Sequence, residues 1–180
     1  MTAQPTLTTE RLTLRPCVPA DAEAIQALVS DVEIARNTLN IPHPYPAGAA
    51  SEWITRHTEK FEKNEEIVFA IVTRGGELVG IIGLVPKQHD VAEIGYWIGV
   101  PYWSRGYASE AARAVIGYAF GELSFNRIEA AHFSRNPASG RVMQKIGMKH
   151  EGTLRQAVKK WSEYVDTELY SVLRSEWPAG

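Results

Sequence analysis

The segment with the most distinctive chemistry is Trp103–Glu110, which reads Trp-Ser-Arg-Gly-Tyr-Ala-Ser-Glu and leads directly into a helical pattern. The first backbone N–H groups of a helix have no partner inside the helix, and the helix dipole adds partial positive charge there. A loop that ends in such a helix start therefore forms an anion site, which a pyrophosphate would fit. Gly106 also has a purely conformational explanation, because glycine adopts turn geometries that other residues avoid. This segment alone leaves both explanations open.

A helix after this segment and a strand before it would hold the anion site in place. Apolar residues recur at helical spacing, which predicts an amphipathic helix, at Ala111, Ala112, Val115, Ile116, Ala119 and Phe120. A strand is predicted over 92–100, and Pro101 ends it. This strand contains Gly95 and Gly99, and glycine inside a strand often marks a bulge or the close approach of another backbone or a ligand.

Downstream of the helix, a strand at 127–133 is followed by a second helix with signals at both ends. Asn136 and Pro137 are typical of the N-cap and first position of a helix, and Gly147 is typical of the residue that ends one. The tail, 151–173, alternates well enough to predict a final pair of strands.

The first half of the chain predicts a short strand, two helices and a hairpin. The strand is 11–15, the helices are 20–30 and 49–63, and the hairpin strands are 67–72 and 78–85. Three prolines make 37–48 a loop, which is either a lid over a substrate site or a rigid connection. The whole order predicts an α/β fold with a mixed sheet of about seven strands and helices on both faces.

The composition limits the class of protein. At 180 residues the chain is expected to form one domain, 1–180, and its 44% hydrophobic content includes no run long enough to span a membrane. The segment 1–10 lacks the pattern of a secretion signal, so a soluble, cytoplasmic protein is expected. A net charge of -2 argues against nucleic acid as a main ligand.

Neither a disulfide nor a metal site is predicted. Cys17 is the only cysteine and is expected to be a small buried residue at the end of a strand. The histidines lie at 43, 57, 89, 132 and 150, without the spacing of metal ligands. We therefore expect the chain to bind no metal.

Three separated segments resemble the GNAT superfamily of N-acetyltransferases, and in particular its branch of ribosomal-protein N-terminal acetyltransferases (RimJ/RimL-like). Thr9–Arg15 matches the Thr-Glu-Arg-Leu-x-Leu-Arg start of that branch, and Tyr102–Ala111 matches its Tyr-Trp-x-Arg-Gly-Tyr-Ala-x-Glu-Ala stretch. The segment 136–147 matches its Asn-x-x-Ser-x-Arg-Val-x-x-Lys-x-Gly stretch. The superfamily's cofactor motif, Gln/Arg-x-x-Gly-x-Gly/Ala, is matched only in its second half, because Trp103 occupies the first position.

This resemblance implies a fold, a cosubstrate and an activity. It implies the GNAT fold, in which strands 92–100 and 127–133 splay apart and the pantetheine arm of acetyl-CoA lies in the gap. It also implies direct attack of a primary amine on the thioester, with backbone N–H groups around 97–100 binding the oxyanion. The residues it assigns to acetyl-CoA are Trp97, Ile98, Gly99, Val100, Arg105, Gly106, Tyr107, Ala108, Ser109, Glu110, Asn136, Ser139 and Arg141.

The resemblance says less about the catalytic residues. Many members protonate the departing thiolate with a tyrosine seven residues after the family asparagine, but Met143 stands there. Ser139 is the expected substitute, and a polar residue in the first turn of a helix is the plain alternative. Glu93 is the first candidate for the general base and His132 the second, although either is alternatively a surface residue. Because an α-amino group has a pKa of about 8, a water relay also suffices.

The sequence leaves the acceptor open. The leading prediction is a protein N-terminal α-amino group, and the alternative is a small amine such as an amino acid, a polyamine or an amino sugar. An acidic acceptor groove would favour polyamines, whereas an open groove would favour peptides. A module that binds acetyl-CoA without turnover is the alternative from another class. A monomer and a homodimer are both compatible with the sequence.

Overall fold

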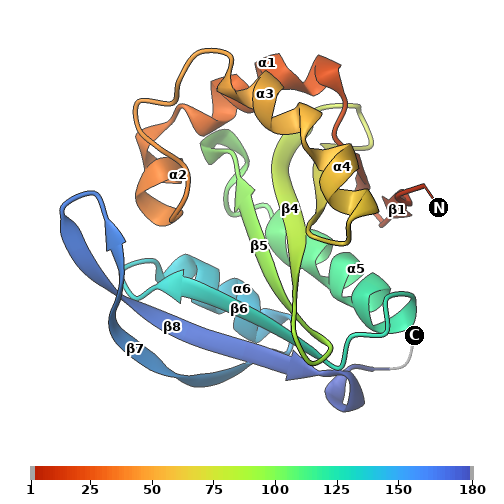
Figure 1. The fold of residues 1–180 in the computed structure, drawn as a ribbon, viewed down its shortest axis with the longest axis vertical. Helices are drawn as coiled ribbons and strands as arrows, with labels where there is room; N and C mark the ends of the chain where they lie inside the picture. Colours follow the sequence, from red (N-terminus) through yellow and green to blue (C-terminus); the bar gives the residue numbers. More distant parts are fainter. Residues whose placement is uncertain (1–2, 179–180) are drawn as a thin grey trace.

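Eight strands form one sheet in the order β1-β2-β3-β4-β5-β6-β8-β7 in the computed structural model, which describes residues 3–178 (Figure 1). Every neighbouring pair is antiparallel except β5 and β6, which are parallel. The strands are β1 (Leu7–Thr8), β2 (Leu12–Pro16), β3 (Ile67–Thr73), β4 (Leu78–Lys87), β5 (Val91–Ile98), β6 (Arg127–Phe133), β7 (Lys149–Lys160) and β8 (Glu163–Leu173).

The predicted mixed sheet is confirmed, with one strand more than expected. The extra strand, β1, is two residues long and pairs with β2, so it is too short to produce a hydrophobic alternation. The two ends of the predicted domain, 1–2 and 179–180, lie outside the described residues.

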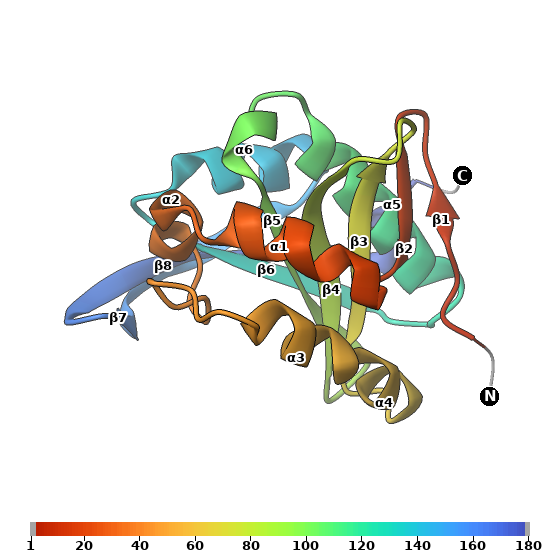
Figure 2. The same cartoon turned by 90° about the horizontal axis from the view of Figure 1, so that it is seen from above.

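Helices cover both faces of the sheet, as predicted. Figure 2 shows α1 and α3 on one face and α5 and α6 on the other, and Phe61 of α4 packs against the cluster on the α5 side. The helices are α1 (Ala22–Val29), α2 (Val32–Asn37), α3 (Ala49–Thr55), α4 (His57–Glu62), α5 (Tyr107–Gly121) and α6 (Pro137–Lys145). Within residues 3–178, no helix is long and apolar enough to cross a membrane.

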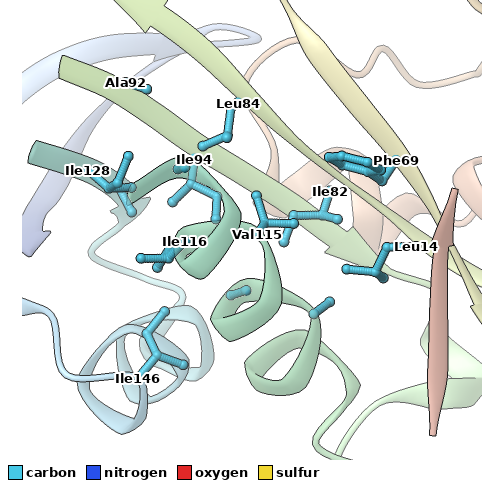
Figure 3. Packing of buried hydrophobic residues seen from close by; sticks show 14 of the residues in the cluster. Leu14, Phe69, Ile82, Leu84, Ala92, Ile94, Val115, Ile116, Ile128 and Ile146 are labelled. Carbon is cyan, nitrogen blue, oxygen red and sulfur yellow. The ribbon is translucent and has the colours of Figure 1, made fainter. Parts of the chain in front are cut away.

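The central strand β3 shows why two layers of helices are needed. Its alternate residues Phe69 and Ile71 face the α5 side, whereas Val68 and Ala70 face the side of α1 and α3. Because side chains alternate along a strand, a strand that is apolar on both faces must be covered on both. Figure 3 shows the α5 side, where Val115 of α5 lies among buried side chains of the sheet.

Two helix predictions differ from the structure in their bounds. The segment predicted as 20–30 begins with a 3-10 turn, Pro19–Asp21, and a further helix, α2, follows after Asp31, which caps it by accepting from the Glu33 N–H. The segment predicted as 49–63 is divided at Arg56 into α3 and α4. The division at Arg56 occurs within continuous helical periodicity, so the pattern alone did not reveal it. Helix α2 lies beyond the predicted helix 20–30, in a stretch for which no element was predicted.

The parallel strands β5 and β6 are paired only at their beginnings. The register joins Val91 to Arg127 and Glu93 to Glu129, and no later residues of the two strands pair. Beyond that point β5 stays with β4 and β6 stays with β8, so the two strands diverge (Figure 1). The predicted splaying of these strands is therefore confirmed.

Candidate active site

A pocket of about 400 Å³ lies at the start of α5 and continues along the diverging part of β5. Most of the residues predicted to bind acetyl-CoA line this pocket, which we call the cofactor pocket, namely Trp97, Ile98, Gly106, Tyr107, Ala108, Ser109, Asn136, Ser139 and Arg141. Segments distant in the sequence therefore meet here, from β5, from the start of α5 and from α6. The charged side chains of Arg141 and Lys145 add positive charge to one wall.

Gly106 gives the start of α5 its shape. It is the N-cap of the helix with a left-handed backbone angle, φ 80°, and no side chain caps the first turn. The first N–H groups of α5 therefore remain available to an anion, as the sequence predicts. The left-handed angle confirms the conformational explanation of Gly106, and the uncapped helix start is compatible with the anion site, which stays a prediction.

Arg11, which lies between β1 and β2 at the edge of the sheet, contacts the segment that leads into α5. We call this segment, residues 103–106, the cofactor loop. Its guanidinium forms an ion pair with Glu110 at 2.6 Å and donates to the carbonyl oxygen of Arg105 at 2.9 Å. Thr9 also donates to the Glu110 carboxylate, at 2.6 Å. Four predicted contacts, Gly99, Val100, Arg105 and Glu110, lie outside the pocket lining. The structure places Glu110 behind the loop, engaged with Arg11 and Thr9.

The end of β5 has backbone N–H groups that face the gap between β5 and β6, but not every N–H group predicted around 97–100 is free to do so. The N–H of Gly99 donates to the carbonyl of Val79 on β4 at 2.9 Å, so it is already engaged. Donors along an antiparallel strand alternate in direction, which turns the N–H groups of Tyr96 and Ile98 toward the open side. The Ile98 carbonyl agrees with this direction, because it accepts a hydrogen bond from the Trp103 indole at 2.6 Å and not from β4.

The start of α6 forms the opposite wall of the gap. Asn136 occupies the N-cap position, as predicted, but its side chain caps nothing and donates instead to the Ser139 hydroxyl at 3.0 Å. The Tyr96 hydroxyl crosses from β5 and donates to the Ser139 carbonyl at 3.3 Å. Tyr96 was not among the predicted site residues. The only sequence signal for it is its place beside Trp97 on the diverging strand.

A second pocket of about 790 Å³ lies on the other side of the diverging strands. Its walls come from α1, α3, the loop 38–48, the middle of β5 and β7, and it touches Tyr96, Trp97 and Ser139 of the cofactor pocket. A side chain at Gly95 would meet no other atom within 4 Å, so this part of β5 is open to the pocket. We call this space the acceptor pocket.

The loop after α2 is a wall of the acceptor pocket and is anchored to the opposite end of the chain. Residues 39–42 line the pocket, and Lys160 at the end of β7 donates to the carbonyls of Leu39 at 3.1 Å and Ile41 at 2.7 Å. Arg135 donates to the Arg36 carbonyl at 3.0 Å. Two cationic side chains thus fix the segment that separates the two pockets.

The two predicted bases both line the acceptor pocket, but Glu93 is ion-paired and the basic nitrogen of His132 is buried. Glu93 lies in the paired part of β5, and its carboxylate forms an ion pair with Lys87 at 2.6 Å. The Nδ1 of His132 lies 2.8 Å from the Phe133 carbonyl and therefore carries the hydrogen. Its Nε2 is buried against Gly140 of α6, where an added Cβ would lie only 2.6 Å away.

The fold defines a class of protein: an α/β protein whose mixed sheet opens between β5 and β6, with a pocket on each side of the gap. The chain belongs to the acetyltransferase (GNAT) family, whose domain model matches residues 11–149. It is an acetyl-CoA-dependent N-acetyltransferase, and the predicted superfamily is confirmed.

Named relatives and a solved structure support this assignment over nearly the whole chain. The uncharacterized N-acetyltransferase YoaA of Bacillus subtilis is 35% identical, with 94% of this chain and 97% of YoaA covered. The putative ribosomal N-acetyltransferase YdaF of the same organism is 29% identical, with 93% and 94% covered. A crystal structure of a GNAT-family acetyltransferase from Bacillus anthracis superimposes with a TM-score of 0.84 at 29% identity, covering 96% of this chain and 100% of that one.

The relatives do not share one acceptor by name. The L-amino acid N-acetyltransferase AaaT of Escherichia coli is 28% identical, with 86% of this chain and 93% of AaaT covered. Family membership therefore establishes the transfer of an acetyl group to nitrogen and leaves the acceptor to the chemistry of the acceptor pocket.

Proposed function

We propose that this protein acetylates the α-amino group at the N-terminus of a peptide or protein. The observation that carries the proposal is the size and charge of the acceptor pocket, about 790 Å³ with no unpaired carboxylate among the described residues. A pocket of this size exceeds the needs of a single small amine and falls in the range of about 300–1,000 Å³ that holds a drug-sized ligand. The named relative YdaF supports the same acceptor class.

Polyamines are the acceptors that the charge pattern disfavours. Glu66 and Glu93 line the acceptor pocket, and each is paired with a lysine, Lys60 at 2.5 Å and Lys87 at 2.6 Å. A polycation would have to displace both lysines to find a negative partner. The acidic groove that would favour polyamines is therefore absent from the described residues.

A free amino acid is the second candidate, and Arg56 favours it. Arg56 lines the acceptor pocket, is exposed, and forms no ion pair within residues 3–178. A guanidinium of this kind binds a carboxylate well, and a free amino acid carries one close to its amine. The relative AaaT supports this candidate.

The proposed chemistry needs little from a general base. A neutral α-amino group with a pKa of about 8 attacks the thioester carbonyl, and the N–H groups of Ile98 and Tyr96 receive the negative charge on oxygen. Glu93 is ion-paired with Lys87, and the basic Nε2 of His132 has no hydrogen-bond partner among the described residues but is buried against Gly140, so the geometry favours water as the proton acceptor. A Glu93→Gln or His132→Gln variant that loses the acid limb of the pH profile would assign the base to that residue instead.

The experiment that tests the function measures release of free thiol from acetyl-CoA in the presence of two panels. One panel holds peptides with different N-terminal residues, and the other holds free amino acids, polyamines and amino sugars. Turnover with peptides alone would support the first candidate, and Arg56→Ala should then leave it little changed. Turnover with amino acids alone, weakened by Arg56→Ala, would support the second. No thiol release with either panel, despite calorimetric binding of acetyl-CoA, would contradict both.

We also propose that the protein is cytoplasmic and that it is a monomer or a homodimer. Fractionation of the producing cells and light scattering of the purified protein test them separately.

A further inference from the structure

The cofactor pocket and the acceptor pocket share a short stretch of wall, where an acetyl group has to pass from cosubstrate to acceptor. The residues that line both pockets are Asn37, Thr38, Tyr96, Trp97 and Ser139. Three of these residues carry a hydroxyl group, namely Thr38, Tyr96 and Ser139. The group that protonates the departing sulfur is therefore to be sought among them.

The three hydroxyls differ in their present partners, and the hydroxyl of Ser139 accepts a hydrogen bond from the Asn136 amide at 3.0 Å. Thr38 donates to the carbonyl of Ile34 in α2 at 2.8 Å, which fixes its hydrogen away from the gap. Tyr96 donates to the Ser139 carbonyl at 3.3 Å, longer than the usual 2.7–2.8 Å of an O–H···O bond. This long bond is weak and is readily exchanged for a better acceptor. Tyr96 also projects from the part of β5 that has left β6, so its ring borders the gap itself.

The hydroxyls also differ in acidity. A thiol has an ordinary pKa of about 8.5 and a tyrosine phenol one of about 10, whereas an aliphatic hydroxyl such as that of Ser139 is a far weaker acid. Burial raises the pKa of Tyr96 above its usual range, so the phenol carries its proton at neutral pH. The same shift makes the phenol a weaker acid than a free tyrosine, so the choice of Tyr96 rests on its position at the gap and on its long, weak hydrogen bond.

We propose that Tyr96, and not Ser139, donates the proton to the departing sulfur, while the Ser139 carbonyl holds the phenol in place. The proposal rests on the acetyl transfer described above and deepens it. In this step a bond forms between the amine nitrogen and the acetyl carbon, and the bond between carbon and sulfur breaks. The sulfur leaves with the electron pair and takes the phenol proton. The amine loses a proton to water, and the phenolate regains one from solvent.

The first test compares Tyr96→Phe with Ser139→Ala, using the acceptor that the wild-type protein turns over. Because a general acid contributes about 10²- to 10⁴-fold, we expect kcat of Tyr96→Phe to fall at least about 100-fold. Ser139→Ala keeps the backbone carbonyl, so its kcat should fall by less than about tenfold. Tyr164→Phe, which removes an exposed phenol outside both pockets, is the matched control. Calorimetry with acetyl-CoA should give the same affinity for Tyr96→Phe and wild type.

A second measurement separates proton donation from packing. Fluorinated tyrosines introduced at position 96 lower the phenol pKa with little change of size. If Tyr96 is the acid, kcat measured below the pKa of each phenol should rise as the phenol becomes more acidic. A constant kcat across the series would limit Tyr96 to a packing role and overturn the proposal.

The failures of the two proposals are distinguishable. A wild-type protein without turnover on any amine overturns the proposed function. A wild-type protein with turnover that Tyr96→Phe retains in full overturns only the role of Tyr96, and a larger loss in Ser139→Ala than in Tyr96→Phe gives the proton to Ser139.

Discussion

The ammonium group of Lys160 donates to the carbonyl oxygen of Ile41 at 2.7 Å, although the two residues are 119 positions apart in the sequence. Lys160 is only 4% exposed, and its second acceptor is the Leu39 carbonyl. Burial, followed by the nearby charge of Arg135, lowers the pKa of this lysine. This cation is held by two carbonyls and by the Trp161 ring at 5.4 Å, without a carboxylate partner among residues 3–178. Burying such a cation is costly, and its retention here coincides with a loop that forms a wall of the acceptor pocket.

We therefore expect Lys160→Met to raise the KM for the acceptor about tenfold, equivalent to one charge-assisted hydrogen bond of about 1.5 kcal/mol. The affinity for acetyl-CoA should not change, because the cofactor loop is held separately by Arg11. Steady-state kinetics with the acceptor varied, and calorimetry with acetyl-CoA, measure the two effects. Lys159→Met, an exposed neighbour on the same strand, is the control. Equal KM values for the two variants would show that the anchor does not shape the pocket.

A second prediction concerns Gly106, whose φ of 80° an alanine adopts at a cost of about 1–2 kcal/mol. In the Gly106→Ala variant without ligand, the loop should leave this conformation, and it would have to return to it when acetyl-CoA binds. We therefore expect the affinity for acetyl-CoA to fall about tenfold. Gly121 lies at the other end of the same helix, and a Cβ there would meet no atom within 4 Å. Gly121→Ala should bind acetyl-CoA as wild type does. Calorimetry that finds identical affinities for both variants would contradict the role of the Gly106 turn.

A third prediction concerns acid stability and Glu168. Hydrogen bonds from the Ser134 and Thr153 hydroxyls and from His150 lower the pKa of this carboxyl from 4.5 to about 2. Because the folded state binds the proton more weakly than the unfolded state, this contribution is complete above pH 4.5 and is lost as the pH falls toward 2. Urea unfolding across this range should show a shallower loss of the free energy of unfolding for Glu168→Gln than for wild type. An equal loss in both proteins would show that Glu168 does not contribute to acid stability. Glu65→Gln, which changes an exposed carboxyl, is the control and should lose stability as wild type does.

A fourth prediction concerns the single cysteine. Burial, followed by the charge of Asp21, raises the pKa of the Cys17 thiol to about 12. The residue follows β2, as predicted, but it is only partly buried, whereas the sequence predicted a buried residue. The thiolate is the reactive form, so the folded protein should react slowly with a disulfide reagent at neutral pH. After unfolding in urea, one thiol per chain should react. Rapid labelling of the folded protein would contradict this prediction and would add background to the thiol-release assay.

Local patterns predicted the elements well where one periodicity runs without interruption. The apolar stripe from Ala111 to Phe120 predicted α5, and the glycine at 147 ends α6 with a left-handed φ of 90°, as expected. Patterns failed where two helices share one periodicity. The break at Arg56 and the separate helix α2 depend on how these segments pack against the sheet, which periodicity does not report.

The features of the candidate site also separate into those that local sequence predicts and those that only the tertiary structure decides. The sequence by itself determined the family, and it predicted the uncapped start of α5 and most of the residues that line the pocket beside it, because these depend on contiguous motifs whose backbone geometry is local. Only the tertiary structure decided which side chains meet across the gap. Tyr96 and Ser139 are 43 residues apart, and Lys160 and Ile41 are 119 apart. Contacts over such separations are set by sheet order and helix packing, and no local sequence signal specifies them.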